Sequence, residues 1–166
     1  MLHKRKLIAN RKLIQELENQ FELIETNSAK WTKTYLDAET EFEWLCFYVD
    51  TEYHGGGIPV FGKLPLPDTN ELIKIAMTSE YDDEVFAACK TLTEKEKNEN
   101  CDFRKVLIDK LETLKDKNRR IKIIELTALD FAINRQVTIG KTFDQIESDF
   151  NFYKEIADKA KKLKNK

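Results

Sequence analysis

Glycine and proline are confined almost entirely to one short segment of this 166-residue chain. All three prolines and four of the five glycines lie between His54 and Pro67, and only Gly140 falls outside that segment. These two residue types end or interrupt helices, so their absence elsewhere leaves long stretches free to be helical. The distribution therefore predicts a helical chain with a single major interruption.

The spacing of apolar residues favours helices on both sides of this loop. In residues 4–25, Leu7, Ile14 and Leu17 recur at the spacing of one helix face, and residues 37–53 are interpreted as a second helix. Further helices are predicted at residues 69–78, 83–99, after Asp102, at 118–136 and after Thr142. Two β-like pieces, Ile58–Phe61 and residues 136–139, are too short to predict a sheet.

We therefore expect an all-α fold, with residues 1–166 forming a single domain of six or seven helices. The stretches Leu72–Leu92 and Phe103–Ala132 are each interpreted as an antiparallel helix pair, so that part of the fold is HEAT-like. The lysine-rich end, residues 159–166, is expected to be frayed.

Several function classes have no support in the sequence. No apolar run is long enough to span a bilayer, and the three widely spaced cysteines form no Cys-x-x-Cys pair, so we expect a cytoplasmic protein with free thiols. Gly140-Lys141-Thr142 lacks the earlier glycine of a phosphate-binding loop, because position 135 is Arg. We expect no cofactor, no metal and no enzymatic activity.

Charge is distributed unevenly along the chain. Residues 36–89 carry two basic and twelve acidic side chains, whereas the segments before and after them are net basic. An acidic centre does not suit direct nucleic-acid binding, which needs a continuous basic surface. It suits docking onto a basic partner, although acidic and basic helices paired within the fold would explain it equally well.

The His54–Gly57 segment permits three interpretations. It can be a structural break in which Gly55 ends a helix, a partner-binding loop, or a site where His54 acts as a base. The sequence shows no nucleophile or carboxylate in an order that would support catalysis. Of the two tryptophans, Trp44 is expected in the core, and Trp31 is either a core or an interface residue.

The central part of the chain resembles the small helical immunity proteins that bacteria encode beside polymorphic or contact-dependent toxins. The resemblance covers residues 40–110 and is carried by several short motifs. They are Trp44 and Tyr48, His54-Gly55-Gly56-Gly57-Ile58-Pro59, Pro67-Asp68 with Glu71-Leu72-Ile73, Ser79 to Val85, Ala87-Ala88 with Leu92, and Phe103-Arg104.

This resemblance implies a non-enzymatic inhibitor that binds a cognate protein toxin and contacts neither membrane nor nucleic acid directly. Many such toxins are basic nucleases, for which an acidic surface would be complementary. The alternative is a helical-repeat adaptor or regulatory module that binds an apolar peptide. Charge and expected exposure nominate the partner-binding residues Glu39, Glu41, Glu43, His54, Glu80, Asp82 and Asp83.

Overall fold

The computed structural model describes residues 2–52, 56–99, 101–133 and 138–166 of the chain. The chain divides into two compact units, residues 1–91 and residues 92–166. The boundary falls inside helix α3 (Asp82–Glu99), so the first half of this helix belongs to unit 1 and the second half to unit 2. Each unit is described by itself, and the expectation of a single domain stays a prediction.

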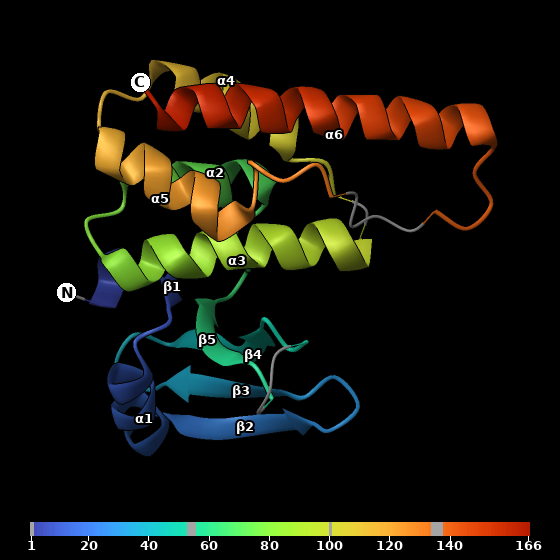
Figure 1. Cartoon of the computed structure of the whole chain (residues 1–166). Coiled ribbons are helices and arrows are strands. Elements are labelled where there is room, and N and C mark those ends of the chain that lie inside the picture. Colours follow the sequence, from blue (N-terminus) through green and yellow to red (C-terminus); the bar gives the residue numbers. More distant parts are fainter. Residues whose placement is uncertain (1, 53–55, 100, 134–137) are drawn as a thin grey trace. The chain divides into compact units, whose positions relative to one another are not determined.

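Unit 1 is built around a five-stranded antiparallel sheet (Figure 1). The strand order is β1-β5-β4-β3-β2, so β2 to β5 form a meander and β1 joins at the far side of β5. The elements are a short 3-10 helix (Leu2–Lys4), β1 (Leu7–Ile8), α1 (Arg11–Gln20), β2 (Glu22–Asn27), β3 (Thr32–Asp37), β4 (Phe42–Val49), β5 (Ile58–Lys63), α2 (Thr69–Thr78) and the start of α3.

The all-α prediction is therefore wrong, because the protein has an α/β fold. Residues 4–25, expected to form one helix, contain β1, α1 and β2. Residues 37–53, expected to form another, begin with the last residue of β3 and contain β4, and residue 53 lies outside the described residues. The piece at Ile58–Phe61, judged too short for a sheet, lies in β5 and pairs on both sides.

Strand β4 shows why the apolar residues of this segment predicted a helix and not a strand. Trp44 and Cys46 belong to the core beneath α1, whereas Val49 lies on the opposite face and is also buried. A strand buried on both faces reads as a continuous apolar run without period-2 alternation, and such a run cannot be told from a helix by periodicity alone.

The core of unit 1 lies between α1 and one face of the sheet. It contains Ile8, Ile14, Leu17, Tyr35, Trp44, Cys46 and Phe61, all at most 4% exposed. The rings of Tyr35 and Phe61 lie 5.3 Å apart, and the Tyr35 hydroxyl donates to the Glu18 carboxylate at 2.9 Å. The expectation that Trp44 lies in the core is confirmed.

Unit 2 is helical in its described residues. It contains the end of α3, α4 (Arg104–Thr113), α5 (Lys117–Thr127) and α6 (Phe143–Lys164), and α6 packs on both α4 and α5. Residues 159–164, where we expected a frayed end, continue α6, and Leu163 is buried. Helices therefore occupy much of the C-terminal region, but the five-stranded sheet excludes the HEAT-like description of the fold.

A buried ion pair lies inside unit 2. The Arg104 guanidinium donates to both oxygens of Glu96, at 2.6 and 3.0 Å, and neither side chain is exposed. The ring of Tyr153 lies 5.0 Å from the same guanidinium. Because this geometry pairs two parallel N–H donors with one carboxylate, the contact fixes the end of α3 against the start of α4.

Candidate partner-binding surface

Three of the predicted partner-binding residues, Glu39, Glu41 and Glu43, lie together on the β3–β4 hairpin and are exposed. The turn is organised by Asp37, whose carboxylate accepts hydrogen bonds from the Glu39 backbone N–H at 3.1 Å and from the Thr40 hydroxyl at 2.6 Å. Glu41 then adopts a left-handed conformation with φ 58°, and the chain returns as β4. The hairpin therefore holds three carboxylates within five residues of chain.

The strand register extends this acidic cluster to β2. Glu22 lies opposite Leu36, which in turn lies opposite Glu43, so the two carboxylates share one sheet face on either side of Leu36. Glu25 lies opposite Thr34 on the same face. All three glutamates are exposed, and they lie on the face opposite α1.

We call the five side chains Glu22, Glu25, Glu39, Glu41 and Glu43 the acidic sheet surface. None of the described β2, β3 and β4 residues on this face is Lys or Arg. Sequence reasoning missed Glu22 and Glu25 because it assigned them to a helix. The usable signal was the short run of residues 22–27 between a helix and an Asn turn.

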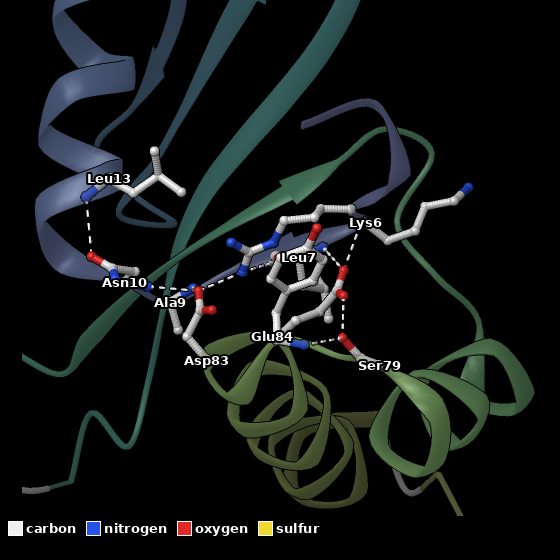
Figure 2. A network of polar contacts seen from close by, with 10 residues as sticks. Lys6, Leu7, Ala9, Asn10, Leu13, Ser79, Asp83 and Glu84 are labelled. Carbon is white, nitrogen blue, oxygen red and sulfur yellow. Dashed lines mark hydrogen bonds and ion pairs between the residues drawn. The ribbon is translucent and has the colours of Figure 1, made fainter. Parts of the chain in front are cut away.

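Asp83, another predicted partner-binding residue, instead makes contacts inside unit 1 (Figure 2). Its Oδ2 atom accepts from the backbone N–H groups of Ala9 and Asn10, both at 3.0 Å, and pairs with the Arg5 guanidinium at 2.5 Å. Its carboxylate attaches the start of α3 to the chain around β1, and a partner-binding role for Asp83 stays a prediction.

The neighbouring Glu84 has the same role. One carboxylate oxygen accepts from the backbone N–H groups of Lys6 at 2.7 Å and Leu7 at 3.1 Å, while the other accepts from the Ser79 hydroxyl at 2.6 Å (Figure 2). Strand β1 is an edge strand, and unpaired edge N–H groups need acceptors. The two carboxylates at the start of α3 therefore complete the hydrogen bonding of this edge.

The predicted residues consequently fall into separate groups. Glu80 and Asp82 are exposed at the start of α3, beside the β1 edge, whereas Glu22 and Glu25 lie on β2 at the opposite edge. His54 lies outside the described residues. Nearby, Gly57 has φ +90°, and a Cβ atom there would lie 2.8 Å from the Val49 carbonyl oxygen, so backbone geometry requires glycine at this position.

Comparisons with protein-family models, curated proteins and solved structures give no match to this chain. In the part of the chain that the structure describes, no helix is long and apolar enough to cross a membrane. Within the same residues, no group of three or more His, Cys, Asp or Glu side chains is placed to hold a metal ion. None of the three cysteines forms a disulfide, and Cys46 and Cys89 are buried.

Proposed function

We propose that this protein is a non-catalytic immunity protein that binds and neutralises a cognate bacterial toxin in the cytoplasm. The observation that supports the proposal is the acidic sheet surface, where five exposed glutamates lie on one hairpin and the adjacent strand. The partner that fits this surface is a basic protein, and a nuclease with a phosphate-binding site is the class of toxin that we favour.

Like charges lie close together on the acidic sheet surface, without basic partners among the described residues. Glu22, Glu25 and Glu43 repel one another across neighbouring strands, and among the described residues no Lys or Arg side chain forms an ion pair with any of the three. A cluster of one sign attracts an oppositely charged partner over distances of about 10 Å and accelerates the encounter. Binding to a basic surface would also remove the repulsion within the cluster.

The cytoplasmic location is part of the same proposal. Thiols persist where glutathione keeps them reduced, and none of the three cysteines forms a disulfide in this structure. A protein that blocks a nucleic-acid-degrading toxin must also act in the compartment that contains the toxin's target.

The test uses the product of the adjacent open reading frame, expressed in a host with and without this protein. We expect the wild-type chain to restore growth. In purified form it should bind that product with an association rate that falls as salt concentration rises. The double reversal Glu41→Lys with Glu43→Lys should lower the association rate about tenfold or more at low salt.

The single reversal Glu43→Lys has a matched control in Glu16→Lys, which makes the same change of charge at an exposed position on α1 outside the acidic sheet surface. Glu16→Lys should leave growth rescue intact and lower the association rate much less than Glu43→Lys. Equal effects of the two variants would show that only net charge matters. Undiminished binding by the hairpin double variant would refute the proposed surface.

A further inference from the structure

The sheet face beneath α1 is only partly covered. Helix α1 is ten residues long, and on its side of the sheet β4 presents Trp44, Cys46 and Tyr48 in succession after Phe42. The first two are each 2% exposed, whereas Tyr48 is 39% exposed. The core therefore ends at Cys46, and the sheet continues past the helix as an open aromatic surface.

Three adjoining hollows surround Tyr48 on this surface. One of about 270 Å³ is lined by Thr26, Asn27, Ser28, Trp31, Lys33 and Tyr48, among others. A second, of about 350 Å³, shares Trp31 and Tyr48 with the first and adds Lys30. A third, also about 270 Å³, lies between Tyr48 and the Arg11 end of α1. We call these hollows together the Trp31 recess.

Trp31 itself is placed in an unusual way. It ends the β2–β3 turn with φ 54°, a left-handed conformation that is unfavourable for a bulky side chain, yet its side chain is 77% exposed. The turn is held by Asn27, whose side chain accepts from the Lys30 backbone N–H at 3.0 Å. Packing within the described fold therefore does not account for a tryptophan here, and such strained positions cluster at binding sites.

The cations around the recess provide an independent observation. Each hollow is lined by one basic side chain: Lys33 in the first, Lys30 in the second and Arg11 in the third. Among the described residues, no carboxylate forms an ion pair with any of these three. Glu18 also lines the third hollow, and its carboxylate, which accepts a hydrogen bond from the Tyr35 hydroxyl, offsets the charge of Arg11 there. The Trp31 side of the recess therefore combines aromatic rings with the positive charges of Lys30 and Lys33.

We propose that the Trp31 recess binds a planar aromatic ring that carries an anionic group, the chemistry of a nucleotide, either free or within a single strand. The ring stacks on Trp31 beside Tyr48, and the phosphate lies among the Lys30 and Lys33 ammonium groups. The hydroxyl and amide groups of Thr26 and Asn27 face the polar edge of the ring. An apolar hollow with a few convergent polar groups is the usual form of a small-molecule site.

This site is separate from the proposed toxin-binding function. Lys33, Cys46 and Tyr48 lie on the α1 face of the sheet, whereas Glu22 and Glu43 lie on the opposite face. The variant with both Glu41→Lys and Glu43→Lys should therefore bind nucleotide as the wild type does, so failure of one proposal is distinguishable from failure of the other.

The experiment titrates the full chain with AMP, adenosine, inorganic phosphate and a single-stranded oligoadenylate, measured by calorimetry and tryptophan fluorescence. We expect saturable AMP binding with a change in Trp31 emission, weaker binding of adenosine, and no emission change with phosphate alone. Tighter binding of the oligoadenylate would identify the strand as the source of the ligand, and equal or weaker binding would identify the free nucleotide.

Three variants locate the site. Trp31→Ala should weaken AMP binding about five- to hundredfold, because base–aromatic stacking contributes on that scale. Lys33→Ala should weaken it about three- to tenfold. The control Lys12→Ala removes an exposed lysine of α1 that lines none of the three hollows and should have no effect.

Circular dichroism confirms that each variant is folded. Absence of saturable binding by both AMP and the oligoadenylate at millimolar concentration overturns the proposal. Adenosine binding as tightly as AMP overturns its anionic part, and equal AMP affinity of the Lys12→Ala and Lys33→Ala variants does the same. Undiminished binding by Trp31→Ala overturns the stacking arrangement.

Discussion

Replacing Asp83 by alanine should destabilise the protein far more than replacing its neighbour Asp82. Asp83 Oδ2 accepts from the Ala9 and Asn10 backbone N–H groups and pairs with Arg5, whose side chain is only 7% exposed. Water can replace the contact at Asn10, which is exposed, but the other two contacts are partly buried. The loss is about 1 kcal/mol for the Ala9 bond and about 2 kcal/mol for the ion pair.

The total of about 3 kcal/mol corresponds to a fall in melting temperature of about 6–12 °C for a chain of this size. Asp82→Ala removes an exposed carboxylate, whose contacts water can replace, from the first turn of α3 and should cost only about 0.5 kcal/mol. Urea unfolding followed by circular dichroism gives the two free energies. Hydrogen exchange at the Ala9 amide reports the same contact locally.

The structural role of Asp83 is refuted if the free energy of unfolding of Asp83→Ala lies within about 0.5 kcal/mol of the wild-type value, the range expected of a surface substitution. It is also refuted if the two aspartate variants are equally destabilised, because Asp83 is the one of the two that Arg5 and the chain around β1 hold in place. A selective loss at Asp83 would confirm that this residue has a structural role in unit 1.

Three further outcomes follow from buried groups. Burial raises the pKa of Cys46 from 9.0 to about 12, so a thiol reagent should modify Cys101 in the native protein and reach Cys46 only on unfolding. Burial, then the hydrogen bond to Glu18, raises the pKa of Tyr35 above its ordinary 10.0, so the folded state favours the neutral phenol. The resulting stability is complete below pH 10 and is lost as the pH rises further, and Tyr35→Phe should reduce this alkaline loss in unfolding titrations. Glu96→Ala leaves the Arg104 guanidinium buried without its carboxylate and should cost about 3–5 kcal/mol by urea unfolding. A cost below about 1 kcal/mol would contradict the buried ion pair.

Non-glycine residues end several elements of this fold in the left-handed conformation. Trp31, Glu41 and Asp50 do so in the turns after β2, β3 and β4, and Ala128 does so after α5. The absence of glycine and proline had favoured continuous helices. In the turns after β2 and β3, however, the side chains of Asn27 and Asp37 organise the chain in place of glycine.

A left-handed residue that is not glycine also ends the helix that we expected at residues 118–136. In the structure α5 ends at Thr127, and Ala128 takes φ 50° while the Leu129 N–H donates to the Ile124 carbonyl at 3.1 Å. This is the hydrogen-bonding pattern of a glycine-terminated helix, but alanine occupies the position. Because no glycine or proline occupies this position, the local sequence did not predict where the helix ends.

Where cap residues are present, the sequence was sufficient. It determined α2, whose predicted limits of Thr69 and Thr78 are those observed, with the Asp68 side chain accepting from the Glu71 N–H. It also determined the start of α6, where Thr142 and Gln145 form the expected capping box. These signals act within one turn of helix, so they do not depend on the remainder of the fold.

The tertiary structure alone decided that five short segments between Leu7 and Lys63 form a sheet. A segment of two residues, Leu7–Ile8, becomes a strand only because β5 pairs with it and because Asp83 and Glu84 accept hydrogen bonds from the chain around it. Strand pairing and burial on both faces are properties of distant segments brought together, and they leave no period in the local sequence. The sequence by itself placed the acidic residues in the centre of the chain; the register of β2, β3 and β4 decided which of them share a surface.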